Sequence, residues 1–255
     1  AANKTVPDAN KMEYHTWEFG VGLSSGYTFK LGFADLTTGG GYQFKLMSKT
    51  YDADTQRPYD TSIAQNLNTW LPSNTVYARA LLNGLDLWYD PSMGYYASQK
   101  LSFSGFLATE QSRYVRSDSK LEGYLKLVDV SLFESFPLKI VLGGHSGFSA
   151  LMPWFGRDAV ETSTSSEYLR IDGTFVGRGW SGTKSLYGYD GIGLWENWLE
   201  LRIPVVPGVL SFDSFLDAAA LLQKDGGLLN VAGAVTKTSS SGASGWSGLS
   251  AENFA

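Results

Sequence analysis

Four apolar side chains occupy every second position near the start of the chain, at Trp17, Phe19, Val21 and Leu23. The residues between them are small or charged, so one side of this segment is wholly apolar and the other is not. Alternation with a period of two is typical of a β-strand whose two faces meet different environments. The same alternation returns in further short segments, at 42–47, 76–89, 97–104, 121–132, 138–148, 195–203 and 209–222. The sequence therefore predicts an all-β fold of about eight strands, each about ten residues long.

The predicted strands are joined by connections of two kinds. Short turns are expected at 37–40, 90–94, 134–137 and 204–208, and long polar loops at 51–74, 109–120 and 150–190, with a Ser/Gly-rich tail from about 236. In a soluble β-sandwich the apolar faces pack on each other, whereas in a transmembrane β-barrel they face lipid and the loops are long on one side only. The pattern favours the antiparallel transmembrane barrel, and a soluble β domain is the alternative.

Composition limits the function more than it defines it. Charged residues make up 18% of the chain and the net charge is −5, which argues against a nucleic-acid partner. There is no cysteine, so disulfides and thiolate metal sites are excluded. The two histidines, His15 and His145, lie far apart, and nothing places a serine beside either one. We expect no catalytic residues, no metal and no cofactor, and we interpret His145 as a strand histidine.

A glycine-rich stretch at 169–182 lies between two predicted strands and contains the sequence Arg178-Gly179-Trp180. Glycine permits tight turns and close approach of the backbone to other groups. Loops that carry particular side chains on a rigid scaffold are often functional. From the residues alone, Arg178 is either bound by other side chains within a folded loop or exposed to solvent in the loop.

Four segments occur in an order that resembles the C-terminal barrel of the BamA-like outer-membrane protein assembly factors: YDPSMGYYASQKLSFSG, LRIDGTFVGRGW, ENWLELRIPVV and FDSFLDAAAL. The resemblance covers roughly residues 75–222. It implies a section of about eight strands from a sixteen-stranded barrel with long extracellular loops. Residues 1–255 would then form a partial C-terminal barrel domain, with the periplasmic POTRA domains and the terminal strands absent from this chain.

The resemblance also implies a site. In the family, a Val-Arg-Gly-Phe-type motif lies at the tip of an extracellular loop that folds back into the lumen. Arg178, Gly179 and Trp180 match its last three positions, while Gly177 stands where the family has a branched residue. The implied partners of Arg178 are the inward-facing Glu200 and Asp217, because a guanidinium binds carboxylates through two parallel hydrogen bonds. The plainer interpretation is that both acids line a water-filled lumen.

By the same resemblance, the function is folding and insertion of β-barrel proteins into the outer membrane, without enzymatic chemistry. The implied partners are unfolded outer-membrane β-barrel proteins, the lipoproteins of an assembly complex and the lipid bilayer, and not nucleic acid. Two alternatives remain. One is an outer-membrane pore or two-partner secretion transporter, and the other is a surface-exposed β-rich adhesin.

Overall fold

The computed structural model describes residues 15–50, 69–106, 112–132, 136–162, 167–171, 191–206, 210–224, 226, 228–240 and 243–249. These residues contain no helix that is long and apolar enough to cross a membrane. They form ten strands: β1 (His15–Lys30), β2 (Asp35–Thr50), β3 (Trp70–Asn83), β4 (Gly94–Ser104), β5 (Tyr114–Leu132), β6 (Phe136–Pro153), β7 (Gly191–Val206), β8 (Leu210–Gln223), β9 (Leu228–Ser240) and β10 (Ala243–Leu249).

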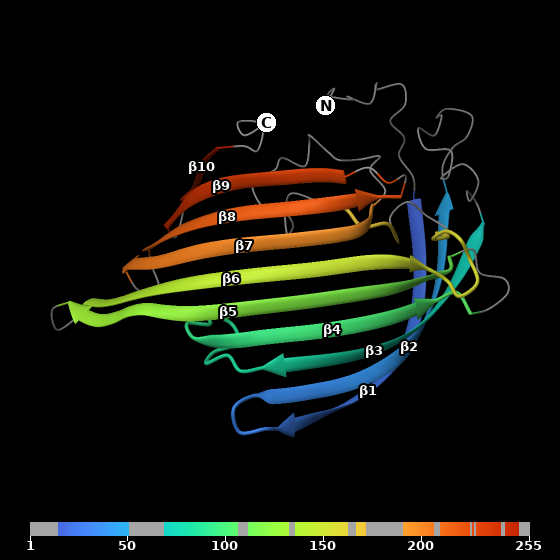
Figure 1. Cartoon of the computed structure of the whole chain (residues 1–255), viewed down its shortest axis with the longest axis horizontal. Helices are drawn as coiled ribbons and strands as arrows, with labels where there is room; N and C mark the ends of the chain where they lie inside the picture. Colours follow the sequence, from blue (N-terminus) through green and yellow to red (C-terminus); the bar gives the residue numbers. More distant parts are fainter. Residues whose placement is uncertain are drawn as a thin grey trace.

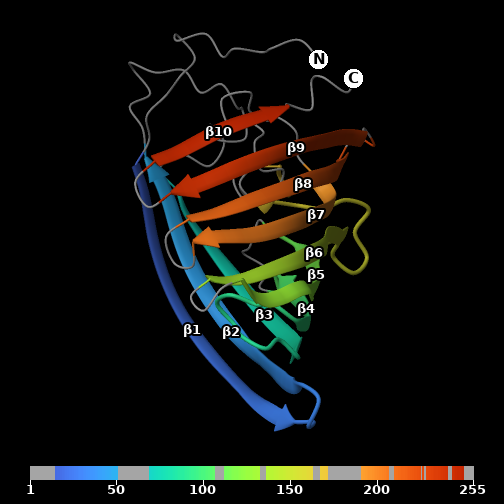
Figure 2. The same ribbon diagram turned by 90° about the vertical axis from the view of Figure 1, so that its left-hand side faces the viewer.

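The ten strands make a single antiparallel sheet in which every strand pairs with its neighbours in the sequence, from β1 to β10. The sheet curves into an open wall, with β1 at one edge and β10 at the other (Figures 1 and 2). Within the described residues, neither edge strand has a second partner. The predicted all-β antiparallel architecture is confirmed, and the described strands number ten where about eight were expected.

The two faces of this wall differ in the way that the alternation predicts. Trp195, Leu199 and Leu216 are exposed on the outer face. The register of β7 with β8 places Glu200 and Asp217 together on the inner face of the same strands. Lipid-facing apolar residues that alternate with lumen-facing polar ones are the defining pattern of a membrane barrel.

The two longest connections lie at the same end of the wall. The β1–β2, β5–β6, β7–β8 and β9–β10 connections lie at one end of the wall, and the long β2–β3 and β6–β7 connections lie at the other. In outer-membrane barrels the short turns are periplasmic and the long loops extracellular. The two ends of the wall are accordingly called periplasmic and extracellular.

The turn expected at 37–40 does not exist, because these residues lie inside β2. The chain reverses instead at 31–34, where Gly32 adopts φ 87° and Leu31 N donates to Ala34 O at 3.0 Å. The glycines of β2 serve close packing of the backbones. A Cβ on Gly39 would lie 2.7 Å from Ser25 O on β1. Glycine within a strand is thus a sign of close approach here and not of a turn.

Several strand ends also differ from the sequence prediction. β3 begins at Trp70 and ends at Asn83, so the strand expected over 76–89 is shifted toward the C-terminus, and its last residues belong to a separate turn. β5 begins at Tyr114, inside the loop expected over 109–120. No strand was expected over 223–250, yet β9 and β10 lie there, and β10 and the end of β9 fall in the Ser/Gly-rich tail. Polar strands escape detection because neither face shows an apolar stripe.

Candidate functional site on the inner wall

Glu200 and Asp217 lie on the inner face of adjacent strands, β7 and β8. Asp217 pairs with Trp198, and Glu200 pairs with Phe215, two residues further along each strand. Side chains at paired positions share a face, so both carboxyl groups point to the same side of the wall. Asp217 is only 4% exposed. The wall therefore presents two neighbouring acids, one of them buried, where the sequence predicted lumen-facing acids.

Arg178, Gly179 and Trp180 lie outside the described residues, so their placement against Glu200 and Asp217 stays a prediction. The two ends of their loop are described. Leu169 N donates to Gly191 O at 2.9 Å, and Gly191 N donates to Leu169 O at 3.1 Å. This short antiparallel bridge brings together the residues on either side of 170–190. The loop thus leaves the wall and returns to it at one point, at the extracellular end of β7.

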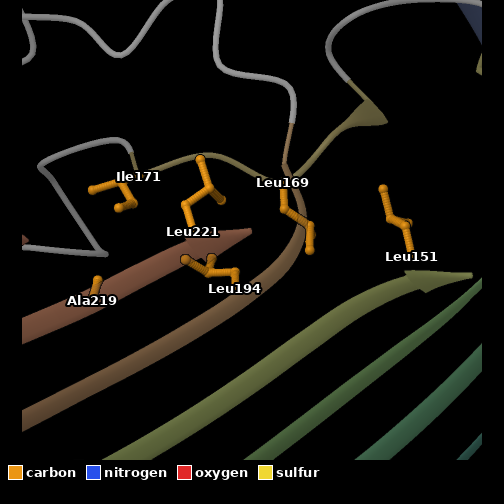
Figure 3. Packing of buried hydrophobic residues seen from close by; sticks show 6 residues of the cluster. All are labelled: Leu151, Leu169, Ile171, Leu194, Ala219 and Leu221. Carbon is orange, nitrogen blue, oxygen red and sulfur yellow. The ribbon is translucent and has the colours of Figure 1, made fainter. Parts of the chain in front are cut away.

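That point is held by a buried apolar cluster on the inner face, which we call the apolar clamp (Figure 3). Two of its members come from the loop and four from the wall: Leu169, Ile171, Leu151, Leu194, Ala219 and Leu221. Leu221 is fully buried, and a Cβ on Gly191 would lie 2.3 Å from its Cδ1. Only glycine fits at 191, because the backbone of Leu169 is also within 2.6 Å of that position.

At the periplasmic end of β7 the inner face is charged. Arg202 Nε donates to Glu200 Oε1 at 2.5 Å, and the guanidinium lies 5.3 Å from the ring centre of Tyr124 on β5. Its Nη1 also lies 3.4 Å from Asp90 Oδ1 and 3.4 Å from the carbonyl oxygen of Pro91. Arg202 therefore joins three separate elements of the barrel.

His145 lies on the inner face of β6, as expected for a strand histidine, and is largely buried. Its ring stacks on Trp198 with 5.4 Å between centroids and 2° between planes. The two ring nitrogens each lie 3.4 Å from a carboxylate oxygen, Nδ1 from Glu122 and Nε2 from Glu196. Glu122 is bound in turn by Lys120 Nζ at 2.7 Å. This arrangement cross-links β5, β6 and β7 and contains no nucleophile.

The β3–β4 connection is a folded periplasmic turn, at 84–93. The Asp86 carboxylate accepts hydrogen bonds from Ser92 Oγ at 2.5 Å and from the backbone N–H groups of Leu87, Ser92 and Met93 at 2.9–3.2 Å. Partial burial acts to raise the pKa of this carboxyl, but the hydrogen bonds outweigh it and hold the pKa well below its usual range. The turn is thus a fixed structure. Its residues 90–93 agree with the turn expected at 90–94, whereas residues 84–89 were interpreted as the end of a strand.

Sequence reasoning found Glu200 and Asp217 but missed what surrounds them. The hydrogen bond between Arg202 and Asp90 joins residues 112 positions apart, and no local pattern announces such a pair. The apolar clamp had a weak signal in the sequence. Leu169 and Ile171 alternate at the start of the glycine-rich stretch, and Leu221 is an apolar residue at a position that the alternation of β8 places inside.

Comparisons with known proteins agree with this architecture. The profile of the Omp85 superfamily domain matches residues 5–249. A putative outer membrane protein assembly factor of Treponema pallidum is 32% identical over 224 residues, which are 86% of this chain and 26% of that protein. The crystal structure of BamA from Haemophilus ducreyi lacking POTRA domains 1–3 superimposes with a TM-score of 0.63 at 15% identity, covering 96% of this chain and 53% of that one.

The solved structure supports the fold, and the family match supports the lineage. The chain spans about a quarter of the length of its curated relative. The resemblance to a section of a BamA-like barrel is confirmed, and with it the location in the outer membrane. The chain belongs to the Omp85 superfamily of outer-membrane β-barrel proteins.

Proposed function

We propose that this chain is part of the barrel of an outer-membrane assembly factor, which folds and inserts other β-barrel proteins into the outer membrane. The proposal is supported by the 32% identity to a protein described as a putative assembly factor. Its substrates are unfolded β-barrel polypeptides, and its further partners are the lipoproteins of an assembly complex. In the intact protein, further barrel strands pair with β1 and β10, which are edge strands within the described residues, since lipid cannot satisfy an unpaired edge. The POTRA domains of the intact protein lie in the periplasm.

The site that serves this function is a lock between the β6–β7 loop and the inner wall. One observation carries it: the base of the loop is joined to β7, the strand of Glu200, by the Leu169–Gly191 bridge, and it packs on the inner face against Leu221 of β8, the strand of Asp217. The Arg178 guanidinium donates to these carboxylates, Gly179 permits the tight turn, and Trp180 packs the loop against the wall. A carboxylate has about four acceptor positions, so Glu200 can bind Arg178 while it also binds Arg202.

The lock is tested by replacing Arg178 with alanine in the full-length protein. We expect less folded barrel and weaker heat-modifiable migration on gels, with Glu200→Ala and Asp217→Ala behaving alike. Lys184→Ala is the matched control, because it removes another cation from the same loop. Normal assembly of all three site variants would rule out the proposed lock.

The function itself is tested by depleting the protein in cells and measuring the amounts of other β-barrel proteins in the outer membrane. An assembly factor predicts a general loss of these proteins. A loss confined to one secreted substrate, together with steady ion conductance of the purified protein, would instead indicate a transporter.

A further inference from the structure

The periplasmic turn 84–93 reaches well beyond the strands that it connects. It joins β3 to β4, yet it contacts Arg202 on β7, and both β5 and β6 lie between β4 and β7 in the sheet. The two contacts with Arg202 Nη1 are to the Asp90 carboxylate and to the carbonyl of Pro91. The turn therefore lies across the inner face of the wall at its periplasmic end.

The turn is held in this position from its own base. Asp86 binds three backbone N–H groups and the Ser92 hydroxyl. Asp86 N donates to Met93 O at 3.1 Å, and Gly84 N donates to Tyr95 O at 2.9 Å. A turn with this many internal hydrogen bonds moves as one body, so a contact at Asp90 and Pro91 fixes all of it.

The other side of Arg202 faces the proposed lock. Nε binds Glu200, and the guanidinium lies over the Tyr124 ring. An arginine has five N–H donors in a rigid plane, so a shift at one edge of the guanidinium moves the other. The same side chain thus contacts both the periplasmic turn and the carboxylate that we assign to the lock.

We infer that Arg202 is a positioning residue that couples the periplasmic turn 84–93 to Glu200. The turn stays across the inner wall because Arg202 binds it, and Glu200 keeps its orientation because Arg202 is anchored by the turn. A protein or domain that binds the turn from the periplasm would therefore act on the lock inside the lumen. Only this last consequence rests on the proposed function, because the coupling itself is a property of the barrel.

The coupling can be measured with a spin label on the turn of the full-length protein refolded in detergent. This chain has no cysteine, and Tyr89 is 84% exposed, so Tyr89→Cys provides a labelling position at the tip. We expect Arg202→Gln to shift the label from an immobile to a mobile spectrum. Glu200→Gln should give a smaller shift in the same direction, because it weakens the ion pair that holds Arg202 on the side away from the turn.

Two further variants guard against a general loss of structure. Asp90→Asn alters a side chain that is 68% exposed, and it should give part of the same shift with the wall intact. Arg116→Gln is the matched control. Arg116 binds Asp118 two residues away on the inner face of β5, as Arg202 binds Glu200 on β7, but its contacts are remote from the turn.

An unchanged spectrum in Arg202→Gln, or an equal shift in Arg116→Gln, would overturn the inference. The readout is independent of assembly activity. If Arg178→Ala impairs assembly while Arg202→Gln leaves the spectrum of the label unchanged, the lock is supported and the coupling is ruled out. If the label responds as expected while Arg178→Ala assembles normally, the coupling survives without the lock.

Discussion

The two ends of the inner wall hold their loops by opposite means. At the extracellular end, Leu169 of the long β6–β7 loop is buried with Leu221 of β8 in the apolar clamp. At the periplasmic end, the turn 84–93 is held by the charged and hydrogen-bonding groups around Arg202. The extracellular contact excludes water, and the periplasmic one is half open to it.

This difference between apolar and charged contacts indicates how firmly each end of the wall holds its loop. Apolar burial contributes about 25 cal/mol for each Å² removed from water and does not depend on direction, so the clamp is suited to keeping a long loop in place. Hydrogen bonds of a guanidinium depend on direction and are weakened by water and salt. The periplasmic contact is therefore suited to changing when a partner binds, while the clamp is suited to staying closed.

The largest expected effect is at the centre of the clamp. Leu221→Ala removes a fully buried side chain and should lower the free energy of unfolding by about 2–5 kcal/mol. The adjacent Leu222 is 42% exposed on the outer face, so Leu222→Ala is the matched control and should cost much less. Denaturant titration of the refolded barrel in lipid measures both. Equal losses of unfolding free energy in the two variants would mean that packing in the clamp stabilises the barrel no more than an outer-face leucine does.

Gly191→Val should come next, with a loss of roughly 1–3 kcal/mol from overpacking. Its new side chain would collide with Leu221 and with the backbone of Leu169 and open the bridge at the base of the loop. Limited proteolysis should then cut the 172–190 segment faster. Gly123→Val is the control, because a Cβ there meets nothing within 4 Å; comparable cleavage in both variants would contradict the packing argument.

Asp86→Ala should have the smallest effect on stability, less than about 1 kcal/mol, because its hydrogen bonds are partly exposed and screened by solvent. The pKa of Asp86 is lowered in the folded turn, so its contribution is present above the unfolded value of about 3.9 and is lost as the pH falls through the folded value. A pH series of the unfolding free energy should show wild type and variant converging only in strong acid. Convergence near neutral pH would argue against the low pKa.

Much of the wall was predictable from alternation alone. Along β7, Leu199 faces out and Glu200 faces in, and along β8 the same holds for Leu216 and Asp217. The orientation of these side chains can be predicted from the sequence because each apolar residue alternates with a polar one. Since one face meets lipid and the other the lumen, successive residues along each strand must differ in polarity.

The rest was hidden for physical reasons. The first part of β5 has Arg116 and Asp118 inside and Ser117 and Ser119 outside, so both faces are polar and the strand looks like a loop. The contact of Arg202 with Asp90 depends on the curvature of the sheet across the four strands from β4 to β7. Such a contact follows from the curvature of the wall and produces no periodic pattern in the sequence.

The central claim is that Arg178 enters the lumen and binds the inner wall at Asp217. A charge reversal tests it most directly, with Arg178→Asp and Asp217→Arg made singly and together in the full-length protein. The account predicts that each single variant loses heat-modifiable folded barrel in the outer membrane and that the double variant recovers a large part of it. Normal folding of the single variants, or a double variant no better than either, would contradict the lock.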